Sequence, residues 1–143
     1  MISLASGLSY FDLDFMQLPR IIATGVVHGP GGVALIDPGP SSTLPRLRST
    51  LATAGISMRD VTTILLTHIH LDHAGGAGDI AALYPNSQLV VHEAGARHLA
   101  DPSRLVASAR RVFGDAMDTL FGELKATPAE RITALSDIAA IDL

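Results

Sequence analysis

Three of the six histidines fall within six residues, and one acidic residue is interleaved with them: His68, His70, Asp72 and His73. Imidazole nitrogens and carboxylate oxygens are the protein ligands that hold zinc, iron or manganese. Composition alone would produce this pattern on the order of once in a thousand such sequences. Two metals about 3.5–4 Å apart can share a water whose pKa falls towards about 7. The pattern therefore predicts a site for two zinc ions, or for iron or manganese; the alternative is a histidine-rich surface loop.

The segments around this motif explain how its side chains would be brought together. Residues 33–37 and 61–67 read as buried strands, and residues 44–54 between them have helical apolar spacing and end before Gly55. A strand–helix–strand unit of this length makes its two strands parallel, and ligands gather beyond the C-terminal ends of such strands. Asp37 and His68 both follow these ends. The glycines after the motif (Gly75, Gly76 and Gly78) are expected to let a loop fold back tightly.

The remaining segments predict a sheet protein with flanking helices. Residues 21–27 and 33–37 should form a hairpin around 29–32, because those glycines precede a strand and do not open a helix as a phosphate loop would. Met117, Phe113 and Phe121 are interpreted as core residues at helical spacing. The other predicted strands are 8–15, 88–91, 131–135 and 138–143, and the other predicted helices are 79–83, 103–113 and 117–124.

One family shares these features. The turn Asp37-Pro-Gly, the strand–helix unit and Leu66-Thr-His-Ile-His-Leu-Asp-His-Ala-Gly-Gly resemble the metallo-β-lactamase superfamily of metal-dependent hydrolases, from about residue 21 to residue 143. The resemblance implies an α/β fold with the αββα layer architecture.

The resemblance also implies roles for the site residues. His68 and His70 would bind one metal, and Asp72 and His73 the second. Asp72 would also guide the proton of the attacking water. Asp37 would orient a ligand histidine through a hydrogen bond, or would be a structural turn residue.

The chain departs from the family pattern after the motif. The family's further ligands are a third histidine, a bridging aspartate and a last histidine, whereas only His92 and His98 follow His73 here. Both are expected to be surface or helix-packing histidines. We therefore expect residues 1–143 to be the N-terminal half of the domain, with an incomplete fold: the first sheet layer and its helices.

Three functions fit these observations. The leading hypothesis is a hydrolase that uses a metal-activated water on an ester, thioester, lactone or similar small substrate. The alternatives are a non-catalytic metal-binding fragment that needs a complementary segment, and an iron-dependent oxidoreductase of the same fold. The flavodiiron branch of the family has a glutamate at the position of His70, which disfavours that oxidoreductase class.

The amino-acid composition excludes some types of ligand and partner. The 143 residues suffice for one domain with a hydrophobic core, and the absence of cysteine excludes disulfides and thiolate ligands. The formal net charge is −4 and the ten basic residues are scattered, so nucleic acid is not an expected partner. No apolar stretch approaches the roughly 18 residues of a membrane helix. A cytoplasmic location, a small-molecule substrate and homo-oligomers formed through the exposed sheet are the resulting expectations.

Overall fold

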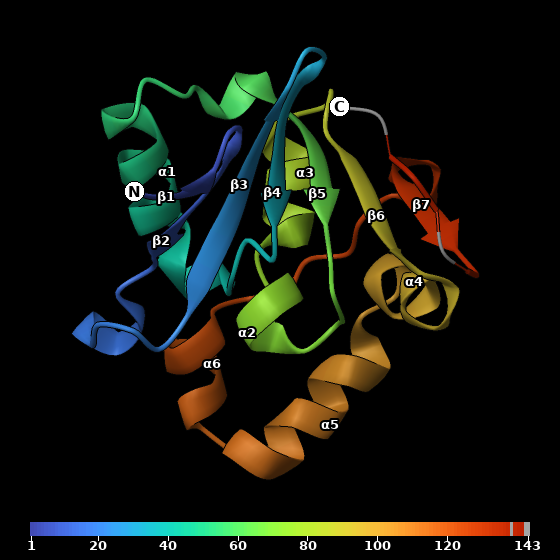
Figure 1. Ribbon diagram of the computed structural model, residues 1–143. Coiled ribbons are helices and arrows are strands. Elements are labelled where there is room, and N and C mark those ends of the chain that lie inside the picture. Colours follow the sequence, from blue (N-terminus) through green and yellow to red (C-terminus); the bar gives the residue numbers. More distant parts are fainter. Residues whose placement is uncertain (138, 142–143) are drawn as a thin grey trace.

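One mixed sheet of seven strands organises the computed structural model, which describes residues 1–137 and 139–141 (Figure 1). The strands lie in the sheet in the same order as in the sequence. Neighbouring strands from β1 to β4 are antiparallel, and those from β4 to β7 are parallel. The strands are β1 (Ile2–Ala5), β2 (Leu8–Asp12), β3 (Ala23–Gly29), β4 (Gly32–Ile36), β5 (Val61–Leu65), β6 (Gln88–His92) and β7 (Ile132–Leu135).

Helices fill the connections of the parallel half. The α-helices are α1 (Leu44–Thr53), α2 (Leu71–Ala74), α3 (Ala77–Leu83), α4 (Glu93–Ala100), α5 (Ser103–Phe113) and α6 (Ala116–Phe121). Short 3-10 turns are η1 (Phe15–Gln17), η2 (Ser41–Thr43), η3 (Met58–Asp60) and η4 (Ala129–Arg131). The predicted hairpin and the β4–α1–β5 unit with parallel strands are both confirmed.

Helix α1 illustrates how apolar spacing and a terminal glycine determine where a helix packs and ends. Its Leu47 and Leu51 repeat at helical spacing and are 0% exposed in the core. Gly55 follows with φ 76°, a left-handed conformation that glycine adopts without a Cβ clash. The N–H of Gly55 donates to the Ala52 carbonyl and that of Ile56 to the Leu51 carbonyl, which satisfies the last carbonyls of the helix.

The two faces of the sheet differ in burial. One row of cross-strand neighbours packs with α1 and α3 and is exposed by no more than 1%: Val26, Leu35, Ile64 and Leu89. Helix α3 lies behind β4 and β5 in Figure 1. A row on the opposite face, Tyr10, Ile36 and Leu65, is only half-buried although it is also apolar. The core therefore lies on the helical side of the sheet.

Several expectations about elements need correction. Strand β2 ends at Asp12 and does not continue to residue 15, because the Asp12 carboxylate accepts the N–H of Asp14 and turns the chain. Strand β1 was not predicted, since its alternation covers only four residues. Of the predicted strand 138–143, residues 138 and 142–143 lie outside the described residues, and 139–141 belong to no strand.

The α5–α6 region confirms part of the predicted core. Met117 and Phe121 are 2% and 9% exposed and pack with Leu71. Phe113 is 41% exposed, so the prediction that it is a core residue is wrong. It is the last residue of α5 and only its ring edge meets Phe121, at a centroid distance of 4.9 Å. Among the described residues, no helix combines the length and the apolarity needed to cross a lipid bilayer.

Candidate metal centre

The ends of β4 and β5 bring the predicted site residues together. The two strands are parallel, with Ile36 opposite Leu65. The N–H of Asp37 continues the pairing by donating to the Leu65 carbonyl at 2.9 Å. Asp37 therefore lies beside the segment that leads from β5 into the histidine motif, as the parallel arrangement predicts.

Asp37 is held in a constrained conformation. Its φ of 50° lies in the left-handed region, which aspartate tolerates better than most residues. The hydroxyl of buried Thr24 donates to the Asp37 carbonyl oxygen at 3.0 Å and fixes the turn. The carboxylate is almost buried and accepts three hydrogen bonds: from Thr67 N at 2.8 Å, Thr67 Oγ1 at 2.6 Å and His73 Nδ1 at 2.9 Å. Non-glycine residues in this conformation are often found at functional sites.

These hydrogen bonds determine which histidine nitrogens face the site. Thr67 Oγ1 has one proton, which it donates to Asp37, so it accepts the proton of His68 Nδ1 at 2.9 Å. His73 likewise donates its Nδ1–H to Asp37. Both imidazoles are thereby assigned the tautomer with a free Nε2 lone pair, which is the form that binds a metal.

The other two motif residues lie against this pair. The ring of His70 meets that of His68 edge-on, with centroids 4.7 Å apart, and the rings of His68 and His73 are 4.0 Å apart. Asp72 Oδ2 lies 3.4 Å from His73 Nε2. His68, Asp72 and His73 are half-buried and His70 is exposed. The four predicted ligand residues therefore lie side by side, His70 against His68, His68 against His73 and Asp72 beside His73.

The donor set fits a metal ion. Ligand atoms about 2.0–2.2 Å from a tetrahedral zinc are about 3.4 Å from one another, which is the separation of Asp72 Oδ2 and His73 Nε2. Among the described residues, the three whose ligand atoms all lie within 4.8 Å of one another are Asp37, His68 and His73, and this group does not include His70 or Asp72. Because three donors already occupy the Asp37 carboxylate, we place Asp37 behind the site and not among the ligands.

The local backbone differs from the expected loop. Asp72 and His73 lie on the one-turn helix α2, and His70 is its N-cap residue. Gly75 and Gly76 have right-handed, helical backbone angles, so they are not needed for positive φ. A Cβ on Gly75 would lie 2.5 Å from the Leu71 carbonyl oxygen and 3.0 Å from Pro40 Cα. These glycines allow the motif to pack closely against the 37–40 turn.

Two further histidines lie outside the motif, and one threonine that was not predicted belongs to the site. His92 is the N-cap of α4 and accepts the N–H of Ala94 at 3.2 Å. In the described part of the chain, His98 Nε2 accepts a hydrogen bond from the neighbouring Arg97 Nε at 3.3 Å. Thr67, which bridges Asp37 and His68, was not predicted as a site residue. The signal for it was a hydroxyl residue directly before the first motif histidine.

A second polar network supports the motif from behind. Ser41 Oγ lies 2.6 Å from Asp79 Oδ2 and 3.0 Å from the Gly75 carbonyl oxygen. Lys125 Nζ lies 2.7 Å from the other oxygen of Asp79. The hydrogen bond that Lys125 donates to the Asp79 carboxylate raises the pKa of Lys125 above its ordinary value. This network connects the end of α2 with the segment that follows α6.

A mixed sheet with a histidine–aspartate group beyond its parallel strand ends defines a metal-binding α/β class. Residues 18–135 match the sequence profile of the metallo-beta-lactamase superfamily, and the chain belongs to that family. The fold is similar to MEM-A1, a subclass B3 metallo-beta-lactamase from a soil metagenome library, with a TM-score of 0.70 and 24% identity. That match covers 99% of this chain and 48% of the other.

Further solved structures have the same fold. Native FEZ-1 metallo-beta-lactamase from Legionella gormanii gives a TM-score of 0.69 at 20% identity, covering 99% of this chain and 48% of that one. BJP-1, a subclass B3 metallo-beta-lactamase of Bradyrhizobium japonicum, gives 0.61 at 24% identity, covering 85% and 42%. The chain thus spans about half the length of the structures that it matches.

Proposed function

We propose that this chain supplies the metal-binding part of a metal-dependent hydrolase that acts on an ester, thioester, lactone or similar small substrate. The observation that carries the proposal is the hydrogen-bonded chain from His73 through Asp37 and Thr67 to His68. It leaves the Nε2 atoms free on two neighbouring imidazoles, whose ring centroids are 4.0 Å apart. Surface histidines without a ligand to bind have no need of such an arrangement.

Each side chain has a distinct role in the proposal. His68 and His70 would hold one ion, and Asp72 and His73 a second, with zinc as the first candidate and iron or manganese as alternatives. A bound metal would supply a water of lowered pKa as the nucleophile. Asp72 would accept a proton from that water, and Asp37 keeps the His73 ring in its orientation through their hydrogen bond.

The number of ligands bears on the activity of the chain itself. Two motif residues per ion are fewer than the three protein ligands that catalytic zinc sites normally have. We infer that a complementary segment supplies the rest, and that residues 1–143 alone bind zinc weakly and hydrolyse little. The half-buried apolar row of Tyr10, Ile36 and Leu65 is the surface we propose for association with that segment or with a second copy.

Asp72→Ala in an active, metal-loaded form of the protein tests the catalytic role. We expect turnover to fall by roughly two orders of magnitude or more, because both a metal ligand and a proton acceptor are lost. The melting temperature should change little, since Asp72 is only half-buried and packs few atoms. A collapsed melting temperature with retained turnover would make Asp72 a structural residue and would contradict the proposal.

Metal analysis combined with a substrate panel separates the hydrolase from an iron-dependent oxidoreductase. The protein is purified without chelators, its metals are quantified, and esters, thioesters and lactones are tested with zinc, manganese and iron. Hydrolysis that depends on added metal supports the proposal. Tightly bound iron together with no hydrolysis of any substrate in the panel would overturn it in favour of redox chemistry.

A further inference from the structure

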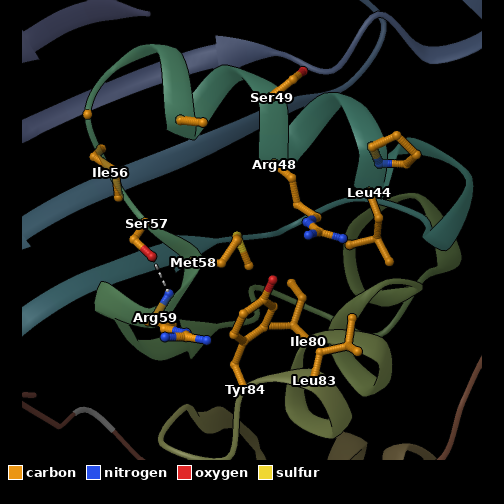
Figure 2. A pocket seen from close by; sticks show the side chains of 13 residues that line it. Leu44, Arg48, Ser49, Ile56, Ser57, Met58, Arg59, Ile80, Leu83 and Tyr84 are labelled. Carbon is orange, nitrogen blue, oxygen red and sulfur yellow. Dashed lines mark hydrogen bonds between the residues drawn. The ribbon is translucent and has the colours of Figure 1, made fainter.

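A groove of about 950 Å³ lies between α1, residues 55–59 and α3 (Figure 2). None of the motif residues lines it. The groove borders η3, which precedes β5, whereas the candidate metal centre follows the other end of β5. A five-residue parallel strand spans roughly 16 Å, so the length of β5 separates the η3 end of the groove from the candidate metal centre, whereas Leu44 at the other end of the groove lies close to Gly76.

Apolar side chains form the body of the groove. Ile80 and Met58 are 1% and 7% exposed and belong to the core, so they present a fixed surface. Leu44 is half-buried, and Leu83 is 58% exposed at the rim. Figure 2 shows these side chains pointing towards the space between the two helices. A ligand with an apolar body would remove the exposed surface of Leu44 and Leu83 from water, which is favourable.

Two cations lie in the same groove without partners. Arg48 and Arg59 are exposed, and neither guanidinium forms an ion pair with any residue in the described part of the chain. Arg46 and Arg110, by contrast, each pair with an aspartate at 2.8 and 2.7 Å. In Figure 2 the Tyr84 hydroxyl lies between the two free guanidinium groups. The carboxylate nearest in sequence, Asp60, accepts the Ser57 N–H at 2.9 Å.

We propose that this groove binds an amphipathic carboxylate, with its apolar body against Met58, Ile80 and Leu83 and its carboxylate between Arg48 and Arg59. Guanidinium groups match the planar geometry of a carboxylate and form charge-assisted hydrogen bonds with it. The Tyr84 hydroxyl adds a donor of the kind that orients a ligand in an otherwise apolar pocket. The volume lies within the range of about 300–1,000 Å³ that is typical of small-molecule sites.

Titration of the isotope-labelled protein with decanoate, followed by amide NMR shifts, tests the location and the affinity together. We expect the largest shifts on α1, η3 and α3. Decanol and decyltrimethylammonium have the same tail without the negative charge. They should bind roughly tenfold more weakly, since a charge-assisted contact at an exposed site is worth only part of its buried value. The test uses no metal and no substrate, so it is independent of the proposed hydrolase activity.

Arg48→Gln and Arg59→Gln should each weaken decanoate binding roughly three- to tenfold and leave decanol binding unchanged. Arg111→Gln is the matched control, because Arg111 is exposed on α5, away from the groove. Leu83→Gln tests the apolar wall at an exposed position where folding is not at risk, and it should weaken both ligands.

Three results would overturn the proposal. The first is the absence of decanoate binding to the unaltered protein, and the second is equal binding of decanoate and decanol. The third is that decanoate shifts only the amide signals of Tyr10, Ile36, Leu65 and their neighbours, and that the arginine substitutions do not change decanoate affinity. That result would place the ligand on the opposite face of the sheet.

Discussion

The two ends of β5 use similar residues in different ways. At its start, the Ser57 hydroxyl accepts the Arg59 N–H and the Asp60 carboxylate accepts the Ser57 N–H, as in a capping box. At its end, Asp37, Thr67 and His73 bind one another through their side chains. The first arrangement satisfies backbone donors and leaves nothing for a ligand. The second aligns imidazole rings with free nitrogens, which is of use only to a ligand.

This difference shows why polar residues at strand ends must be judged by their hydrogen-bond partners. Side chains that bind backbone groups contribute to folding, typically by about 0.5–2 kcal/mol at a helix cap. Side chains that orient one another and leave ring nitrogens free can contribute to binding a ligand. Matched substitutions at the two ends of β5 therefore test whether only the arrangement at its end serves metal binding.

The largest effect is expected from the motif histidines. His68→Ala and His73→Ala should each lower zinc affinity by at least roughly a hundredfold, because each removes one ligand from a site that has few. Calorimetric titration measures the affinity, and His98→Ala is the control, since His98 lies on α4, outside the motif. If His98→Ala weakened binding as much as His73→Ala, the proposed ligand set would be wrong.

Asp37→Asn should follow in size. Asparagine also tolerates the left-handed backbone at this position, but its amide cannot accept the three hydrogen bonds that the carboxylate accepts. We expect zinc affinity to fall roughly 10–100-fold. Asp60→Asn at the other end of β5 should lower the free energy of unfolding by up to about 1 kcal/mol and leave zinc binding unchanged. Equal effects of both variants on zinc would remove the distinction between the two ends.

Thr67→Val removes the hydroxyl that bridges Asp37 and His68 and keeps the shape of the side chain. We expect zinc affinity to fall roughly three- to tenfold, because the His68 tautomer is no longer selected. The free energy of unfolding should fall by about 1 kcal/mol for the lost hydrogen bond. Thr62→Val, near the start of the same strand, is the matched control and should not affect zinc affinity.

The smallest effect concerns the Lys125–Asp79 pair and depends on pH. The hydrogen bond that Lys125 donates to Asp79 raises the pKa of Lys125 above the ordinary value of 10.5. A raised pKa means that the stabilisation is fully present below pH 10.5 and is lost as pH rises through the higher folded value. Denaturant titration of Lys125→Met and the unaltered protein should show a stability difference at neutral pH that disappears in strong alkali. A constant difference at all pH values would assign the effect to packing.

The sequence predicted the features that local patterns encode. The β4–α1–β5 unit follows from apolar spacing and from Gly55, and the motif at the end of β5 follows from the position of His68 after an apolar run. The close packing at Gly75 could be predicted only in part, because a Cβ there would meet Pro40 Cα as well as the nearby Leu71 carbonyl oxygen. The same holds for Asp79, whose partner Lys125 is distant in sequence. Contacts of this kind depend on the folded topology.

The proposal that the three motif histidines bind metal can be tested by titrating the protein with zinc while the NMR signals of the histidine rings are recorded. We expect zinc to shift the NMR signals of the His68, His70 and His73 rings together and to leave those of the His92 and His98 rings unchanged. We also expect Asp37→Asn to weaken this response without moving it to other residues. Zinc-dependent shifts at His92 or His98 alone, or no response of the motif rings at any zinc concentration, would contradict the account.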